Sequence, residues 1–356
     1  MRRIVLLLLL VALPLVAQLP PGTTRTNFRQ YLWAYTLVAL PDDSLWALDY
    51  WNIQGTRIHP DGTTADFDLP KPWRSVAATA GPDGALWILS AGQIGRVDPQ
   101  TRAVQRWAVA VGSPFLLSGP DGNLWFGGAG NQVKRMRPDG TMLDSYPIGG
   151  PATGAVFGSD GALYLATGTS LVRITIDGQR TEFPAAVSGD LYAGPGFLWN
   201  GDRGFLEPGD RAPSATIRKL SLQGETLASY TLDMTSFAAD ALGNLWLRTT
   251  LAGGSDVVAQ LSPQGVLTRF GPFPPLPWSE CRPRFYGGMV FLSGGRVAMA
   301  DFYPDIPIPA SAPPPCGDPT WKPEFRNTLT IFDPRIVPVI SVEALNRTSR
   351  RRSVRH

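Results

Sequence analysis

The feature that most constrains this sequence is a short unit that recurs about every 40 residues, the spacing of four-stranded propeller blades. Its clearest copy is residues 81–89, with the sequence GPDGALWIL. Pro, Asp and Gly favour a tight turn, because Pro fixes one φ angle, Asp bonds to its own backbone and Gly accepts a positive φ. The apolar run that follows is typical of a short buried strand. The unit therefore predicts a hairpin.

Other stretches repeat this turn-and-strand pattern at residues 43–46, 121–125, 160–164, 195–199, 243–246 and, in degraded form, 294–297. A second turn follows each first one after about 15 residues, with a strand-like run on either side. Such four-stranded units bury both faces only when they stack around an axis. The sequence thus predicts an all-β fold, a seven-bladed β-propeller of four-stranded antiparallel blades. The tryptophans of the repeat are expected in the core between blades: Trp46, Trp87, Trp125, Trp199 and Trp246.

The motif GPDGxLW, followed by IGRVDP at residues 94–99, resembles the virginiamycin B lyase (streptogramin lyase) family of seven-bladed propellers. The resemblance covers most of residues 36–335. Its motif positions are mostly structural, so they specify fold better than function. The resemblance implies a magnesium-assisted elimination that opens a cyclic ester, with a histidine as base and carboxylates that hold the metal.

This chain departs from the family pattern at the base. It has two histidines, of which His356 ends the chain and His59 immediately precedes a tight turn. A general base must reach the proton that it removes, and His59 is expected on the face opposite the long loops. The family's glutamate after Leu-Trp-Phe-Thr is also missing, since residues 124–127 read LWFG and residues 245–248 read LWLR. We therefore expect no catalytic residue to carry over.

The ends of the chain differ from the repeat. Residues 1–17 have a basic start, an apolar run and a small residue at the end, which indicates a signal peptide, with an uncleaved anchor as the alternative. We expect a flexible leader over 18–30, the propeller over 31–343 and a basic, disordered tail over 344–356. The protein is then secreted or periplasmic, with no membrane span after cleavage of the signal.

The sequence is compatible with alternatives for ring closure and for the cysteines. Residues 30–35 and 337–342 compete to supply the outer strand that closes the ring. Cys281 lies in the connection before the seventh unit, and Cys316 lies in a Pro-rich insertion within it. A single cysteine pair in an exported chain predicts one disulfide, with two free thiols as the alternative.

Charge argues against nucleic acid as a partner. The net charge is +3, to which the five arginines of the tail contribute +5 and Arg2 and Arg3 contribute +2. The rest of the chain is left at −4. A mildly acidic body gives no support for nucleic-acid binding.

The loops after the second strand of each unit, and the connections between units, should share one face, opposite the tight turns. We call it the loop face. Its loops are longer, and binding residues concentrate on loops that a rigid scaffold holds. Eight residues there are candidate ligand contacts: Asp49, Tyr50, Trp51, Asn200, Asp202, Arg248, Asp301 and Tyr303. Aromatic rings beside carboxylates and amides suit a small molecule, a glycan or a protein partner.

The favoured interpretation is a monomeric scaffold that binds a ligand or protein and needs no cofactor. The alternative is a lactonase-like hydrolase or a lyase in which Asp49, Asp202 and Asp301 hold Ca²⁺ or Mg²⁺ near the axis, because hard cations take several oxygen ligands. A third interpretation is purely structural: Asp and Asn side chains in loops often satisfy neighbouring backbone groups.

Overall fold

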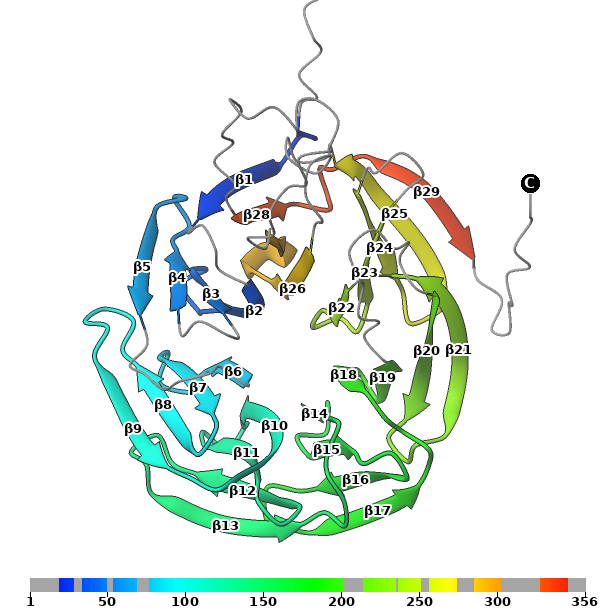
Figure 1. Cartoon of the computed structure of the whole chain (residues 1–356). Helices are drawn as coiled ribbons and strands as arrows, with labels where there is room; N and C mark the ends of the chain where they lie inside the picture. The colour runs from blue at the N-terminus through cyan, green and yellow to red at the C-terminus, as the bar shows by residue number, and fades with distance from the viewer. Residues whose placement is uncertain are drawn as a thin grey trace, which may run out of the picture.

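Seven antiparallel sheets are arranged around a central axis (Figure 1). We call the space at this axis, which the first strands of six blades line, the channel. The computed structural model describes residues 19–28, 34–49, 54–68, 77–201, 214–234, 236–250, 256–273, 285–302 and 327–344. The predicted seven-bladed β-propeller is confirmed. Within the described ranges no helix is long and apolar enough to cross a membrane.

The strands of each of the first six blades follow chain order from the channel outward. Blades 1 and 2 consist of β2 (Ala34–Ala39), β3 (Leu45–Asp49), β4 (Gln54–Ile58) and β5 (Thr64–Asp68), then β6 (Ala77–Ala80), β7 (Leu86–Ser90), β8 (Gln93–Val97) and β9 (Val104–Ala108). Blades 3 and 4 consist of β10 (Val111–Ser118), β11 (Leu124–Gly128), β12 (Gln132–Met136) and β13 (Met142–Pro147), then β14 (Gly154–Phe157), β15 (Leu163–Ala166), β16 (Ser170–Ile174) and β17 (Arg180–Pro184). Blades 5 and 6 consist of β18 (Asp190–Gly194), β19 (Phe197–Gly201), β20 (Ser214–Ser221) and β21 (Thr226–Asp233), then β22 (Ser236–Ala239), β23 (Leu245–Thr250), β24 (Asp256–Leu261) and β25 (Val266–Phe273).

The N-terminal strand closes the ring. Blade 7 contains β26 (Phe285–Phe291), β27 (Val297–Phe302) and β28 (Asn327–Phe332), with the short 3-10 turn η1 (Ser293–Gly295) between the first two. Its outer strand is β1 (Thr23–Phe28), which pairs antiparallel with β28. Neither stretch that competed for this role provides it. The expected leader over 18–30 is therefore corrected, because part of it is a propeller strand.

The C-terminal competitor for ring closure joins a different blade. Strand β29 (Val339–Ala344) pairs antiparallel with β25 and so adds a fifth strand to the outer edge of blade 6. Both ends of the described chain thus lie on neighbouring blades at the rim (Figure 1). The ring is closed by the pairing of β1 with β28. Strand β29 takes no part in this closure, because it pairs with β25.

The repeat folds as its chemistry predicts. In the turn of blade 2, the Gly84 amide donates to the Gly81 carbonyl at 3.0 Å, and the Gly81 amide donates to the Ala85 carbonyl at 2.8 Å. Gly84 has φ 73°, a conformation that glycine adopts without strain. The tryptophan that follows, Trp87, is fully buried with Leu89 and residues of blade 3. The tryptophans predicted to be core are all at most 2% exposed.

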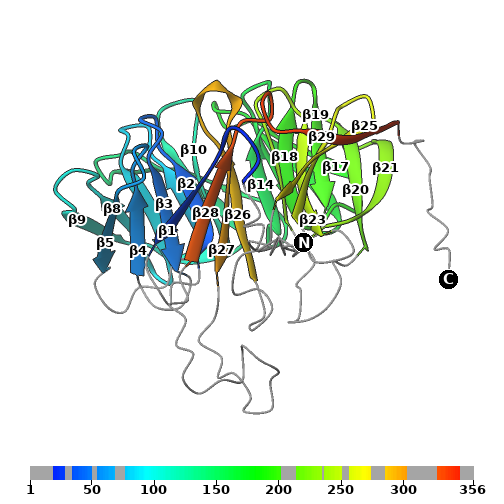
Figure 2. The ribbon, with the colours of Figure 1, turned by 90° about the horizontal axis from the view of Figure 1, so that it is seen from above.

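The two faces of the ring differ as expected. The tight turns, such as the one between β26 and β27, gather on the upper face in the edge-on view (Figure 2). First strands begin at the opposite, loop face and run toward the turns. The beginnings of first strands and the ends of second strands therefore meet at the loop face, and this is where the candidate site lies.

Candidate functional site

Four of the eight candidate residues lie within the described ranges. Asp49, Asn200, Arg248 and Asp301 come at or near the ends of second strands, and each is at most 1% exposed. Tyr50, Trp51, Asp202 and Tyr303 lie outside the described residues, as do Cys281 and Cys316, so the aromatic contacts and the disulfide stay predictions. The four described side chains are buried behind the channel wall.

Asn200 holds a connection between blades. Its Nδ2 donates to the carbonyls of Ser188 at 2.6 Å and Asp190 at 3.2 Å, and its Oδ1 accepts from Arg218 Nη2 at 2.6 Å. Arg218 also donates to the carbonyl of Ala186 at 2.8 Å. Buried backbone carbonyls need such donors. Asn200 therefore fixes residues 186–190, which enter β18 at the loop face.

Arg248 and Asp301 form an ion pair between blades 6 and 7. Arg248 Nη2 lies 2.6 Å from Asp301 Oδ1, and Nη1 donates to the carbonyl of Ala300 at 3.0 Å. Both side chains are 0% exposed. Removing one partner of such a pair leaves a buried charge uncompensated, which typically costs about 3–5 kcal/mol. The pair therefore ties the two blades together close to the channel.

A cavity of about 490 Å³ lies in the loop-face half of the channel. Six of the seven first strands contribute to its wall, mostly through their early residues, which include Ala77 and Ala78 of β6, Asp190 of β18 and Ser236 of β22. A smaller adjoining cavity of about 190 Å³ shares Ala77, Pro114 and Asp190 with the first and reaches blade 4. Pockets of several hundred Å³ are the size that small ligands occupy.

The cavity wall combines small residues with polar ones, which include Thr36, Asp190 and Ser236. Ser236 is 9% exposed, and its Oγ has no hydrogen-bond partner among the described residues. It stands directly opposite Arg248 in the register of β22 and β23. The hydroxyl of Tyr192 donates to the carbonyl of Phe237 at 3.0 Å. A buried hydroxyl without a protein partner is satisfied by water or by a ligand.

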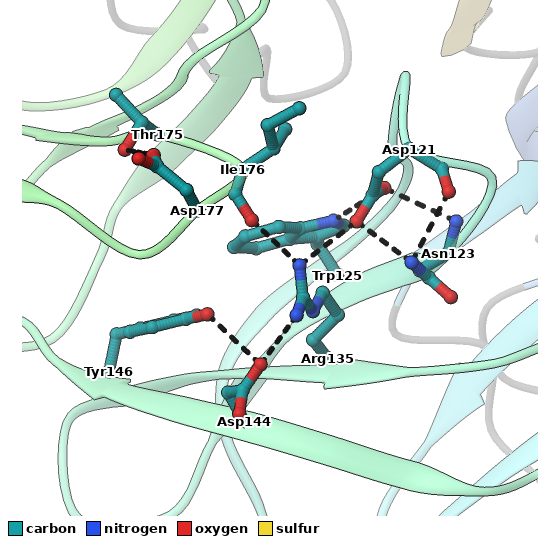
Figure 3. Close-up of polar contacts among 9 residues, drawn as sticks. All are labelled: Asp121, Asn123, Trp125, Arg135, Asp144, Tyr146, Thr175, Ile176 and Asp177. Carbon is teal, nitrogen blue, oxygen red and sulfur yellow. Dashed lines mark hydrogen bonds and ion pairs between the residues drawn. The ribbon is translucent and has the colours of Figure 1, made fainter.

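The turn face carries a recurring network that the sequence reasoning missed. In blade 3, Asp121 accepts from Trp125 Nε1 at 3.1 Å and from Arg135 Nη1 at 3.2 Å (Figure 3). Arg135 stands opposite Trp125 in the register of β11 and β12, with its guanidinium 5.3 Å from the ring centroid. The same triad is Asp83, Trp87 and Arg96 in blade 2, and Asp160, Tyr164 and Arg173 in blade 4.

These contacts hold the turn carboxylates ionised. Burial alone would raise the pKa of Asp121, but hydrogen bonds from Asn123 and Trp125 and the charge of Arg135 outweigh it and lower that pKa. The pKa values of Asp83 and Asp160 are lowered in the same way. In blade 4, burial and then the hydrogen bond to Asp160 raise the pKa of Tyr164 to about 12.

The basic residue of the third strand also reaches the next blade. Arg57 of blade 1 donates to the carbonyl of Pro99, Arg135 of blade 3 to that of Ile176 at 2.8 Å, and Lys219 of blade 5 to that of Pro263 at 2.9 Å.

A signal for this network was present in the sequence. An aromatic residue follows the turn aspartate by 4 positions and an arginine by 13 or 14. The turn face is therefore built for stability.

Comparison with known proteins agrees with this architecture. Residues 23–193 match the sequence model of the virginiamycin B lyase family. A streptogramin B lyase structure aligns with a TM-score of 0.60 and 17% identity, over 87% of this chain and 97% of that one. Virginiamycin B lyase from Staphylococcus aureus, in a selenomethionine-substituted structure, aligns with a TM-score of 0.60 and 20% identity, over 78% and 94% of the two chains. Comparison with curated proteins finds no match.

A third solved structure is a catalytically inactive histidine-to-alanine variant of the Staphylococcus aureus lyase with quinupristin, at a TM-score of 0.60 and 18% identity, over 87% and 99% of the chains. At this level of identity the likeness establishes the fold. By class, this protein is a seven-bladed β-propeller with four-stranded blades and a channel cavity at one face. More particularly, its fold is similar to that of the virginiamycin B lyases, whose family model matches residues 23–193.

Proposed function

We propose that this chain is an exported scaffold that binds a small molecule, a glycan or a protein segment at the loop-face end of its channel. The observation that carries the proposal is the 490 Å³ cavity framed by first strands of six blades. Such a frame is rigid, because each first strand is hydrogen-bonded into its own blade. A pre-formed cavity avoids the entropic cost of ordering a site on binding.

The residues present favour binding over the elimination that the family resemblance implies. One histidine, His59, belongs to the turn after β4, where its amide donates to the Thr63 carbonyl at 2.9 Å. That turn is on the face opposite the cavity. The other histidine, His356, is the last residue of the chain. A base must lie within hydrogen-bond reach of the proton that it removes, so His59 is poorly placed for chemistry in the cavity.

The runner-up is a divalent-metal hydrolase or lyase that uses Asp49, Asp202 and Asp301. The fit at Asp301 is poor, because a cation there would share the carboxylate with a guanidinium 2.6 Å away. Among the described residues, no group of three His, Cys, Asp or Glu side chains is arranged to hold a metal ion. Asp202 lies outside those residues. The cavity that the binding proposal needs is formed by described residues, so binding is favoured over the metal-dependent alternative.

Filling the cavity tests the proposal. Ala78 lines it, and an Ala78→Phe substitution would occupy part of its volume. Ala108→Phe is the matched control, since Ala108 is exposed at the end of β9 in the same blade. A panel of sugars, small peptides and cyclic depsipeptides is screened against the wild type by saturation-transfer NMR. Hits should be lost in Ala78→Phe and kept in Ala108→Phe. Hits that survive in Ala78→Phe would show that binding occurs elsewhere.

A further inference from the structure

The outermost strand of blade 6 exposes aliphatic side chains in a way that the other outer strands do not. In and just before β29, four residues form what we call the aliphatic ridge: Ile336 (54% exposed), Val339 (51%), Ile340 (44%) and Val342 (65%). The outer strands β13 and β21 each expose one large apolar side chain, and the described outer strands β1, β5, β9 and β17 expose none. Clustered exposed apolar residues mark interaction sites.

The two sides of β29 have different chemistry. Val339 and Val342 stand opposite Phe270 and Thr268, which are two residues apart on β25 and so share one side of the blade. Val339 and Val342 are three positions apart, and they lie on the same side because the register shifts at Ile340. The ridge therefore presents its two valines on the same side.

The polar residues of β29 lie on the opposite side of the blade. Ser341 stands opposite Arg269, and Arg269 Nη1 lies 3.3 Å from Ser341 Oγ and 3.1 Å from Glu343 Oε2. The charge of Glu343 is thus balanced by its own chain. The valine side of β29 is left apolar, and Arg269 of β25 offsets the one negative charge of the strand.

The sequence directly after the ridge is strongly basic. Residues 345–356 contain five arginines and no acidic residue, whereas the body of the chain is mildly acidic. A polybasic segment is attracted to anionic lipid headgroups, and an adjacent apolar element that inserts among them supplies the second signal that stable attachment needs. A second copy of this chain fits less well, because it would bring another tail of five arginines to the same edge.

We propose that the aliphatic ridge and the arginine tail together dock this propeller on an anionic lipid surface. The tail supplies attraction, and the ridge supplies insertion at the interface. Docking through this edge places the membrane at the rim of blade 6. The channel cavity, which opens at the loop face, is left accessible to ligand.

Vesicle co-sedimentation of the full chain, as an exporting host processes it, tests the proposal. Vesicles of phosphatidylcholine are used with and without phosphatidylglycerol, at low and high salt. The ridge variant is Val339→Ser with Val342→Ser, and the tail variant replaces the five arginines by glutamine. Leu242→Ser is the control for the ridge, since Leu242 is 74% exposed on the turn face. All variants share one N-terminus, which is defined by mass spectrometry, and thermal melts check that each is folded.

The wild type should bind only the anionic vesicles, and more weakly at high salt. Binding should fall by about fivefold for each arginine neutralised. The ridge variant should lose on the order of tenfold at both salt concentrations, while Leu242→Ser loses nothing. Three results would overturn the proposal: no wild-type binding to anionic vesicles, equal binding by the ridge variant, or a ridge-dependent dimer in ultracentrifugation without vesicle binding.

Discussion

The turn aspartates show how single residues stabilise this fold. In blades 2 to 4 the turn aspartates Asp83, Asp121 and Asp160 each close a turn, accept from a buried indole or phenol and pair with an arginine of the third strand. Blade 1 lacks this arrangement, because Asp42 bonds to Ser44 and Arg57 while Asp43 bonds to Ser293 and Arg296 of blade 7. Trp46 Nε1 is accordingly buried without a hydrogen-bond partner among the described residues. Asp43 serves the junction between the first and last blades instead.

Removing one turn aspartate tests this role. Asp121→Ala should lower the free energy of unfolding by about 1–3 kcal/mol, because it leaves Trp125 Nε1 buried without an acceptor. The control is Asp144→Ala, which removes the other carboxylate on Arg135 (Figure 3). Asp144 is 57% exposed, so its loss should cost less than about 1 kcal/mol. Equal losses in a chemical denaturation experiment would contradict the assigned role.

The lowered pKa values of Asp83, Asp121 and Asp160 predict acid sensitivity. In the unfolded chain these groups titrate near 3.8, so at low pH the unfolded state binds more protons than the folded state. Their stabilisation is fully present above that value and is lost as pH falls through the lower folded pKa values. Unfolding free energies measured from about pH 6 to pH 2.5 should show this fall. It should be smaller in Asp83→Asn, and an unchanged slope would refute the linkage.

For single residues, the sequence predicts the core or face to which a residue belongs better than it predicts the contacts that the side chain makes. The core tryptophans follow from the repeat, since an apolar run after a tight turn has to be buried. Asn200 and Arg248 were expected on the correct face, but their burial was not foreseen. Whether a loop-face side chain points to solvent or into a blade junction depends on the neighbouring blade, which lies about 40 residues away in the sequence.

The two end strands show what element-level patterns can and cannot establish. Both β1 and β29 lie outside the regular repeat, and their partners are set by how the ring closes. The sequence of β1, TTRTNF, has little of the apolar pattern that marks a strand. Phe28 nevertheless packs between blades 7 and 1, where it is 3% exposed. Pairing with β28 decides the structure of this segment, and local propensity does not.

Deleting each end strand separately tests whether the closed ring depends on β1 or on β29. A chain that begins at residue 29 should lose cooperative unfolding, because the outer edge of blade 7 and the Phe28 contacts are lost. A chain that ends at residue 338 should still unfold cooperatively, because β29 lies outside the ring closure. Urea unfolding followed by tryptophan fluorescence provides the measurement. Greater damage from the C-terminal deletion would show that the ring depends on β29.

At the scale of the whole molecule, the closed ring has a cavity at its loop face, and we expect the ligand to bind there. We expect no change in the melting temperature when EDTA is replaced by Ca²⁺ or Mg²⁺. A cation at 100 times its dissociation constant would add about 2.7 kcal/mol, which raises the melting temperature by a few degrees for a protein of this size. A rise with one cation would favour the hydrolase, and Asp49→Asn would then show whether the predicted ligands hold the metal.

The most direct test of whether this chain is a scaffold or an enzyme is the fate of quinupristin incubated with the protein and Mg²⁺. Chromatography with mass spectrometry separates three outcomes, because elimination linearises the ring without changing its mass and hydrolysis adds one water. The account predicts that the cyclic compound is recovered unchanged, whether or not it binds. A linear isomer of the same mass would show that the chain is a lyase, and a product heavier by one water would show that it is a hydrolase. Either product would contradict the proposed scaffold.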